Sequence, residues 1–333
     1  MPELLVTQER AVPELLVVEP VFAERLWGGS TLRAWFGAAV PEGIIGECWA
    51  VSGMPGMSGY IRSGAPEGLT LRQAWAAGLV TGREEPGDFP LLCKFLDPQD
   101  WLSVQVHPDD AQAQALEGQP RGKAECWLVV SCADDATLIL GHTAATAEDL
   151  RQSLVDGTLM EHLVTVPVAQ DDFFMVHAGE VHSVGPGMLV YEVQQSSDIT
   201  YRLYDFDRVG PDGKQRELHV DKGFSVVTAP HDPAAARTAG PWEQIRPRGR
   251  TRVLVDCPQF RVQRWELLHE DCLIEHSDYM VLTVIGGWGT LSTDSQSIEV
   301  GLGTSVVIPA GTGAVRLAGD MIAITTFPGP ELA

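Results

Sequence analysis

The segment WLSVQVHPDD, residues 101–110, places three polar side chains on one face of an expected strand. Side chains alternate along a strand, so the leucine and the valines face one way while Ser103, Gln105 and His107 share the other face. A hydroxyl, an amide and an imidazole in a row can bind a metal ion or a polar ligand. This row therefore predicts a polar site inside an otherwise apolar fold.

Two further segments supply side chains of the same kind. GKAECWLVV, residues 122–130, brings Glu125 to the mouth of an apolar strand, with Lys123 on the same face. HAGEVH, residues 177–182, closes a β-run with an Ala-Gly turn, and the histidine that follows resembles the metal ligand that cupin barrels present in this way. Mixed nitrogen and oxygen ligands suit a divalent metal and leave room for a substrate. The candidate ligands are Gln105, His107, Glu125 and His182.

The elements that must position these residues are mostly strands. Short β-type runs recur along the chain and are separated by turn residues, with 34 glycines and 22 prolines in 333 residues. Many short strands of this kind are typical of a β-sandwich or barrel. Helical periodicity is limited to residues 70–80, 109–118 and 146–164, each with a Thr or Asp near its start. A mainly β fold with a small helical insertion in its N-terminal part is predicted.

The chain divides at a segment rich in Ala, Pro and Arg, which we interpret as a linker over 229–250. It separates an N-terminal catalytic domain, residues 1–228, from an all-β C-terminal domain, residues 251–333. Residues 1–18 are predicted to be an extension that precedes the fold.

A second Ala-Gly turn, IPAGTGA at 308–314, resembles the first. When the two turns are aligned, Ala314 falls opposite His182, so the second copy keeps the turn and lacks the ligand. We therefore expect two cupin-like β-barrel or jelly-roll halves, with a metal only in the N-terminal one.

Composition narrows the class of partner. The hydrophobic fraction is 44%, and no window approaches the ~18 apolar residues of a membrane span. A net charge of −22 argues against nucleic acids and anionic membranes as partners. The N-terminus lacks the pattern of a secretory signal, and none of the six cysteines forms a CxxC pair. We expect free thiols, a cytoplasmic location and a monomer or homodimer.

The order of the motifs resembles that of type I mannose-6-phosphate isomerases of the short bacterial form, members of the cupin superfamily. The resemblance runs from about residue 20 to residue 225 and is specific in its combination of motifs. It is carried by RLWGG, GECWAVSG, FPLLCKFLDPQDWLSVQVHPDD, GKAECW, AGEVHSVGPGMLVYEVQQSSDITYRLYDFDR and GKQRELHVDKG.

The resemblance implies roles for individual residues. One zinc ion per chain would be held by Gln105, His107, Glu125 and His182. The family's phosphate-anchoring serine would be Ser103. The basic residues that line the family's pocket would be Lys94 and Lys123. Its catalytic arginine would be Arg202, and Glu192 matches an acidic residue that lines the active site. Where the family usually has a proline before the Ala-Gly turn, this chain has His177.

The implied reaction interconverts mannose-6-phosphate and fructose-6-phosphate by moving a proton between C2 and C1 through an enediol. A metal and Arg202 would stabilise the developing charge, and a general base would move the proton. Glu192 is our first choice as the base, with Lys123 and His177 as alternatives. Arg25 and Trp27 are interpreted as scaffold.

Other functions stay open at this point. An isomerase of the same fold could act on another hexose phosphate or on a free sugar. A sugar-binding cupin that holds a metal without turnover is a third hypothesis. A cupin dioxygenase is disfavoured, because such chemistry usually requires redox iron held by several histidines.

Overall fold

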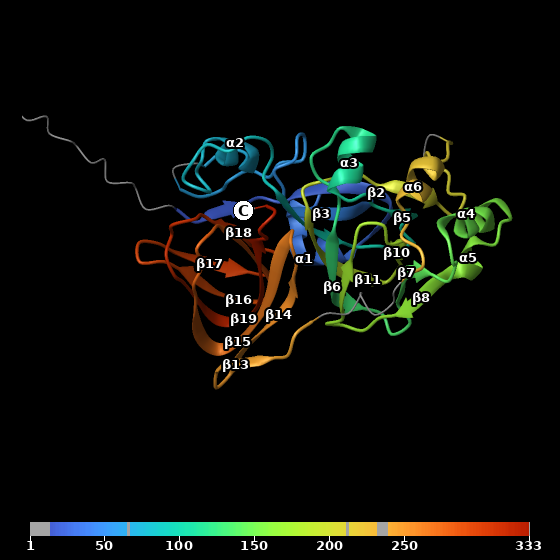
Figure 1. Ribbon diagram of the computed structural model, residues 1–333. Coiled ribbons are helices and arrows are strands. Elements are labelled where there is room, and N and C mark those ends of the chain that lie inside the picture. The colour runs from blue at the N-terminus through green and yellow to red at the C-terminus, as the bar shows by residue number, and fades with distance from the viewer. Residues whose placement is uncertain (1–13, 65–66, 211–212, 232–238, 333) are drawn as a thin grey trace, which may run out of the picture.

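The computed structural model describes residues 14–64, 67–210, 213–231 and 239–332. They form three open sheets and several short helices, which confirms a mainly β fold. In Figure 1 the orange and red C-terminal strands form one half of the molecule, and the green and yellow segments lie in the other. No helix in the described part of the chain is long and apolar enough to cross a membrane.

A six-stranded sheet runs through the middle of the molecule. Its order is β2-β3-β4-β11-β6-β9, and its neighbouring strands are antiparallel. The strands are β2 (Val21–Gly29), β3 (Ile45–Val51), β4 (Leu91–Leu96), β6 (Glu125–Cys132), β9 (Phe173–Val176) and β11 (Met188–Gln195). Burial is complete along β3, β4 and β11, so both faces of this sheet are covered.

A five-stranded sheet packs on one face of the six-stranded sheet. Its order is β12-β5-β10-β7-β8. The strands are β5 (Val104–Val106), β7 (Thr137–His142), β8 (Leu163–Pro167), β10 (His182–Val184) and β12 (Tyr201–Tyr204). The edge strands of the two sheets are not hydrogen-bonded to each other, so the sheets form a cupin-like sandwich. The expected jelly-roll character is correct, and the alternative of a closed barrel is wrong.

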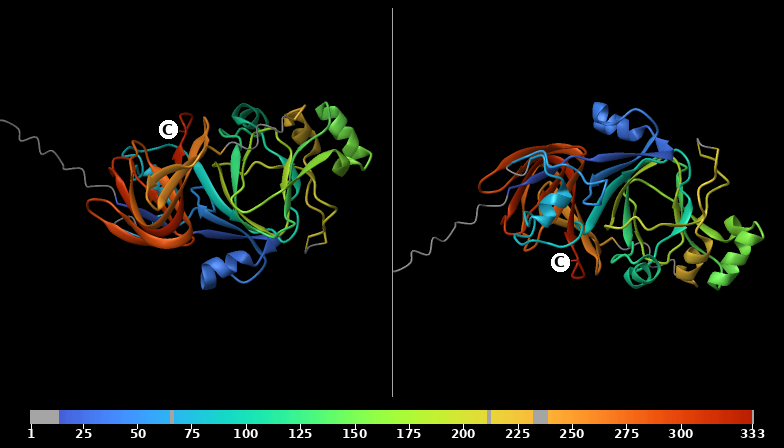
Figure 2. Two further views of the ribbon diagram at one scale, coloured as in Figure 1. Left: turned by 90° about the horizontal axis from the view of Figure 1, so that it is seen from below. Right: turned by 90° about the horizontal axis from the view of Figure 1, so that it is seen from above.

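An eight-stranded sheet covers the other face. Its order is β1-β18-β16-β19-β15-β14-β13, with β17 paired to β16. The strands are β1 (Leu16–Val18), β13 (Glu243–Arg246), β14 (Gly249–Asp256), β15 (Phe260–Ile274), β16 (Met280–Ser292), β17 (Ser297–Gly301), β18 (Ser305–Ile308) and β19 (Val315–Pro328). Figure 2 shows these long strands curling beside the N-terminal half.

Two sequence boundaries need correction. Residues 1–18 were expected to precede the fold, yet β1 pairs with β18 and buries Leu16 and Val18, because an edge strand was available to its apolar side chains. Residues 1–13 lie outside the described part of the chain. The expected linker over 229–250 already contains β13 and the start of β14, whose polar exposed residues concealed the strand pattern.

The helices are short and lie between strands. They are α1 (Thr31–Phe36), α2 (Leu71–Ala76), α3 (Asp110–Glu117), α4 (Ala147–Val155), α5 (Leu159–His162) and α6 (Val220–Val226). Capping boxes start α2 at Thr70 and α3 at Asp109, and Thr146 caps α4, as their sequences predict. α1 and α6 had no clear periodicity and were not predicted.

The strand alternation divides the middle sheet between core and site. On β4 and β11, Cys93 and Tyr191 join a core cluster shared with the eight-stranded sheet. Their neighbours Lys94 and Glu192 face the other way, toward the five-stranded sheet. The Tyr191 hydroxyl donates a hydrogen bond of 2.9 Å to Thr283 across the interface. The C-terminal half therefore covers the back of the sheet whose front carries the polar residues.

Candidate active site

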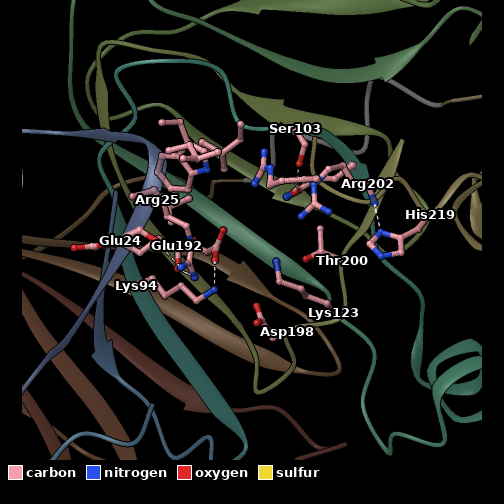
Figure 3. A pocket seen from close by; sticks show the side chains of 17 residues that line it. Glu24, Arg25, Lys94, Ser103, Lys123, Glu192, Asp198, Thr200, Arg202 and His219 are labelled. Atoms are coloured by element: carbon pink, nitrogen blue, oxygen red, sulfur yellow. Dashed lines mark hydrogen bonds and ion pairs between the residues drawn. The ribbon is translucent and has the colours of Figure 1, made fainter. Parts of the chain in front are cut away.

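A polar cavity of about 590 Å³ lies between the six-stranded and five-stranded sheets. Figure 3 shows its labelled side chains converging from both sheets. Lys94 and Glu192 lie together on the wall made by β4 and β11, and Ser103 and Arg202 lie at the opposite end. Of the polar row predicted for residues 101–110, Ser103 and Gln105 line this cavity.

A three-residue cluster that could hold a metal ion lies beside the cavity. Ligand atoms of His107, Glu125 and His182 all lie within 4.8 Å of one another, and all three residues are buried. They come from the residue after β5, the first residue of β6 and the first residue of β10. In the described part of the chain this is the one cluster of its kind.

Hydrogen bonds orient both imidazoles of this cluster. Nδ1 of His107 donates to the carbonyl oxygen of Ile199 at 2.8 Å, and Nδ1 of His182 donates to that of Glu180 at 2.8 Å. Each Nε2 therefore keeps its lone pair and points toward the carboxylate. Backbone carbonyls fix metal-binding histidines in this way.

The electrostatics keep these rings neutral. Burial lowers the pKa of His182 to about 3, and the nearby Lys123 ammonium adds to the shift. Burial and Lys123 also hold the pKa of His107 well below its usual range. A neutral imidazole is the form that binds a metal.

The carboxylate between the rings has an unsatisfied oxygen. Oε1 of Glu125 is buried without a hydrogen-bond partner and lies 3.4 Å from Nε2 of His182. The Lys123 ammonium contacts Oε2 and lies 3.1 Å from Nε2 of His107. The site therefore already accommodates a positive charge against these ligand atoms, which is what a bound cation requires.

Gln105 completes the neighbourhood of His182. Its amide nitrogen lies 3.2 Å from Nε2 of His182, and its amide oxygen lies 3.3 Å from the Ser103 hydroxyl. A half-turn of the amide about its last bond exchanges the two atoms, which gives an oxygen ligand at the same place. The residues present therefore fit a divalent cation.

Glu192 is buried on the wall of the cavity. Burial raises the pKa of its carboxyl group, and the charge of Glu125 adds to the effect. Trp127 donates its indole N–H to Oε2 at 3.0 Å, whereas Oε1 lies 3.6 Å from the Lys94 ammonium. A carboxyl group with a raised pKa can accept and return a proton near neutral pH.

The predicted basic pocket is divided by the structure. Ser103 and Arg202 lie at one end of the cavity, whereas Lys94 lies beside Glu192 and over the ring of Trp49, 4.5 Å from its centroid. Nη1 of Arg202 donates to the carbonyl oxygen of Glu217 at 2.8 Å. Lys94 and Arg202 line the same cavity but belong to strands of different sheets, β4 and β12. The grouping of Lys94, Lys123 and Arg202 around one phosphate stays a prediction.

Several cavity residues were not assigned a role from the sequence. Arg216 lines the cavity near Arg202 and pairs with the Asp205 carboxylate. Asp198, Thr200 and His219 also line it. Their chain distance from the quoted polar row hid them, although Asp198 and Thr200 belong to the QQSSDITYR motif.

Arg25 and Trp27, interpreted as scaffold, line the cavity as well. Nη2 of Arg25 pairs with Glu47 at 2.9 Å, and Trp49 donates its indole N–H to the same carboxylate at 2.7 Å. Burial raises the pKa of Glu47, but Lys94 and Arg25 outweigh it and leave that pKa lowered. The motif GECW could have revealed Glu47, since an acid inside a buried strand needs charged partners.

His177 does not belong to the cavity wall. His177 is exposed, and its backbone N–H donates a hydrogen bond to Oε2 of Glu180 at 2.8 Å. His177 does not line the cavity, so it is not placed to act as the general base.

Comparisons with known proteins agree with this geometry. Residues 15–130 match the family model for the phosphomannose isomerase type I catalytic domain, and residues 250–328 match that for the mannose-6-phosphate isomerase cupin domain. Mannose-6-phosphate isomerase ManA of Bacillus subtilis (strain 168) is 39% identical over 92% of this chain and 96% of its own. The chain belongs to the type I phosphomannose isomerase family.

Other relatives extend this result. The mannose-6-phosphate isomerase of Streptococcus mutans is 36% identical over 92% of this chain and 97% of its own. The crystal structure of the mannose 6-phosphate isomerase from Bacillus subtilis superimposes with a TM-score of 0.88 at 32% identity, covering 94% of this chain and 99% of that one. A variant of phosphomannose isomerase from Salmonella typhimurium, 16% identical with a TM-score of 0.76, covers 95% of this chain and 99% of its own and shares the fold.

Proposed function

We propose that this protein is a metal-dependent aldose–ketose isomerase that interconverts mannose-6-phosphate and fructose-6-phosphate. The observation that carries the proposal is the cluster of His107, Glu125 and His182 beside a cavity with a buried carboxyl group and a separate arginine end. Family membership supports the substrate, a sugar phosphate.

The metal would be held by Gln105, His107, Glu125 and His182. Two imidazole nitrogens with a carboxylate and an amide oxygen favour zinc among divalent cations. When bound there, such an ion would supply Lewis-acid stabilisation of the negative charge that develops on the substrate. Because Lys123 contacts the same atoms, a bound cation would compete with its ammonium group.

Glu192 moves the proton between C2 and C1 in this proposal. Trp127 fixes one of its oxygens, and the other faces Lys94 at the cavity wall. Burial raises the pKa of Glu192, which makes its carboxylate a stronger base. The carboxylate would accept a proton from one carbon, and the carboxylic acid so formed would return it to the other. Lys123 remains the alternative base, since it is buried and lines the same cavity.

Ser103, Arg202 and Arg216 form the proposed anion-binding end. Both guanidinium groups and the hydroxyl reach the cavity from the five-stranded sheet and the loop that follows it. Arginine binds phosphate with two N–H groups at once, which fixes the remote end of the substrate. Anchoring that end uses binding energy to orient the reacting carbons near Glu192. The catalytic role that the family resemblance implies for Arg202 is a separate proposal, and the effect of Arg202→Ala on kcat tests it.

Lys94 takes a different part in this proposal. Its ammonium lies near both Glu192 and Glu47, so it balances buried carboxylates at the reacting end of the cavity. It is also able to donate a hydrogen bond to a sugar hydroxyl there. The substrate-binding role predicted for Lys94 is therefore retained, without direct phosphate contact.

The cellular setting is also a proposal. All six cysteines are free, and four of them are buried. Unpaired thiols of this kind suit a reducing compartment, which supports the cytoplasm. A monomer or a homodimer remains the expectation.

A coupled assay that follows fructose-6-phosphate formed from mannose-6-phosphate tests the proposed function. We expect activity in the purified protein, loss of activity after chelation and recovery when zinc is restored. Undiminished activity after complete metal removal would contradict the metal-dependent mechanism.

If all three samples are inactive, the same assay format with glucose-6-phosphate and free mannose decides the alternatives. Turnover of either would indicate an isomerase of another sugar. Binding of sugar without any turnover would indicate a metal-dependent sugar-binding cupin.

A further inference from the structure

The turn that carries His182 is held from two sides. We call residues 177–182 the ligand turn. On the side of the site, the N–H of Gly179 donates to the carbonyl oxygen of His107 at 2.8 Å. The carbonyl oxygen of Glu180 accepts the Nδ1 hydrogen bond of His182. The backbone of this turn therefore links both imidazoles of the candidate metal site.

On its other side the ligand turn contacts the chain that follows α6. The N–H of Thr228 donates to the carbonyl oxygen of Gly179 at 2.8 Å. Nε2 of His142 lies 3.1 Å from the carbonyl oxygen of Thr228, to which it donates. Residues 226–231 thus lie against the turn and against the end of β7.

His231 fills a space between the turn and β7. Its side chain is 5% exposed, and its Nδ1 lies 3.9 Å from Oε1 of Glu180, whose side chain is 7% exposed. Gly141 has a φ of +87°, and a Cβ there would lie 2.1 Å from the His231 ring. Only glycine at position 141 allows this approach.

Glu180 joins these contacts to the turn. Oε2 of Glu180 accepts the backbone N–H of His177, and Oε1 faces His231. One carboxylate thus closes the start of the ligand turn and holds the segment outside it. Neither Glu180 nor His231 lines the cavity, so we expect any effect on the reaction to be indirect and to pass through the ligand turn.

We propose that Glu180 and His231 are positioning residues, which clamp the ligand turn so that His182 is preorganised for a divalent cation. The inference rests on the proposed function in so far as that function requires a metal at His182. Groups that fix a metal ligand from behind commonly change metal affinity when they are mutated.

We call the contacts of Glu180 and His231 with the ligand turn the clamp. Cobalt(II) binding to the full-length protein tests the clamp without relying on turnover. After chelation, the wild-type, Glu180→Gln, His231→Ala and doubly substituted proteins are titrated with cobalt(II) against a chromophoric chelator. We expect roughly tenfold or greater weakening of cobalt binding in each single variant, with little further loss in the double variant. The visible absorption of bound cobalt should also change, because it reports ligand geometry.

A matched control removes another contact between a histidine and a carboxylate. Nδ1 of His269 pairs with Asp320 at 2.7 Å on the C-terminal half, where the His269 side chain is 70% exposed. We expect His269→Ala and Asp320→Asn to leave cobalt affinity and the cobalt spectrum unchanged. Melting temperatures of the metal-free proteins separate a general loss of stability from loosening of the turn.

Substitution at Gly141 provides a second test that does not depend on Glu180. Gly141→Ala should weaken cobalt binding in the wild-type protein by displacing the His231 ring. The positive φ at position 141 strains alanine whether or not His231 is present. The clash between the new Cβ and the His231 ring, however, disappears in the His231→Ala background. A smaller effect of Gly141→Ala in that background supports the clamp, and equal effects in both backgrounds contradict it.

The outcomes separate the clamp from the proposed function. Wild-type affinity and an unchanged spectrum in Glu180→Gln and His231→Ala would overturn the clamp while metal-dependent isomerisation stands. If the wild-type protein binds no cobalt, zinc or other divalent cation, both proposals fail. Weaker cobalt binding with an unchanged KM for mannose-6-phosphate at saturating metal supports the clamp.

Discussion

The two halves of the molecule carry the same kind of turn but surround it differently. Gly179 and Gly311 both lie in Ala-Gly turns, with φ of +85° and +78°. After the first turn comes His182, which is fully buried, and after the second comes Ala314, which is exposed. Backbone conformation alone therefore does not make a site.

The inner faces of the sheets account for the difference. In the N-terminal half, Lys94, Glu125 and Glu192 are buried together between two sheets. The corresponding interior of the C-terminal half is a cluster of apolar side chains that includes Leu282, Val306 and Leu317. Burying charge is costly unless each charge has a partner, so one half keeps a polar cavity and the other half a packed core.

The largest effect should come from removing the ligand that distinguishes the halves. We expect His182→Ala to lower kcat/KM by about 10³-fold, or ~4 kcal/mol, because the metal's stabilisation of the transition state is lost. Metal content per chain and kcat/KM should fall together. If His182→Ala lost its metal and kept its activity, the reaction would not depend on the metal ligand that distinguishes the first turn from the second.

Glu192→Gln comes next and tests the charged wall of the N-terminal half. A missing general base costs about 10²–10⁴-fold in rate. Because burial raises the pKa of Glu192, wild-type kcat/KM should fall with acidification at a pH above the ordinary range of glutamate. The pH profile of the variant should lack this limb, and persistence of the limb would assign it to another group.

The same raised pKa has a consequence for stability. The fold favours the protonated form of Glu192, so its contribution to stability is present below the unfolded-state pKa and is lost as pH rises through the folded-state pKa. We therefore expect Glu192→Gln to resist denaturant at least as well as wild type at neutral pH. The difference should shrink as the pH is lowered.

Arg202→Ala tests the opposite end of the cavity. If Arg202 has the catalytic role that the family resemblance implies, its loss should cost about 10²–10³-fold in kcat, or ~2.7–4 kcal/mol, as the loss of a fixed donor to developing charge does. Phosphate anchoring adds a rise in KM, whereas Arg202→Lys keeps the charge and should recover part of the loss. An unchanged kcat with only a raised KM would restrict Arg202 to binding.

A smaller effect is expected at the contact between the halves. Tyr191→Phe removes the hydroxyl that donates to Thr283 in the buried interface. We expect a loss of about 1 kcal/mol in the free energy of unfolding, measured by urea denaturation. A double-mutant cycle with Thr283→Val should show coupling, and additive losses would mean that this hydrogen bond does not join the halves.

The smallest effect on metal binding should follow from placing a histidine after the second Ala-Gly turn. Ala314→His leaves the apolar interior of the C-terminal half unchanged, so we expect no second metal equivalent by elemental analysis. Stoichiometric binding of a second ion would show that the turn alone creates a site.

Strand patterns and motifs were readable in the sequence because they are local. Alternation predicted that Ser103, Gln105 and His107 share a face, and the Ala-Gly turn singled out His182. The capping residues of α2, α3 and α4 likewise act within a few residues. The family resemblance supplied Glu192 and Arg202, which no local pattern marks as a pair.

Only the tertiary structure decided which distant groups meet. The arrangement of the two sheets separates Lys94 from Ser103. The chain that follows β12 brings Arg216 into the same cavity as Arg202, at a sequence separation where no local pattern operates. It also places β1 beside β18 at opposite ends of the chain.

By itself, then, the sequence determined many of the strands, the caps of α2, α3 and α4, and the side-chain types available for chemistry. The fold decided their partners: the carbonyl that holds each imidazole, the core behind Tyr191 and the contact of His231 with Gly141. The physical reason is that alternation and capping depend on neighbours in the chain, whereas burial and charge pairing depend on neighbours in space.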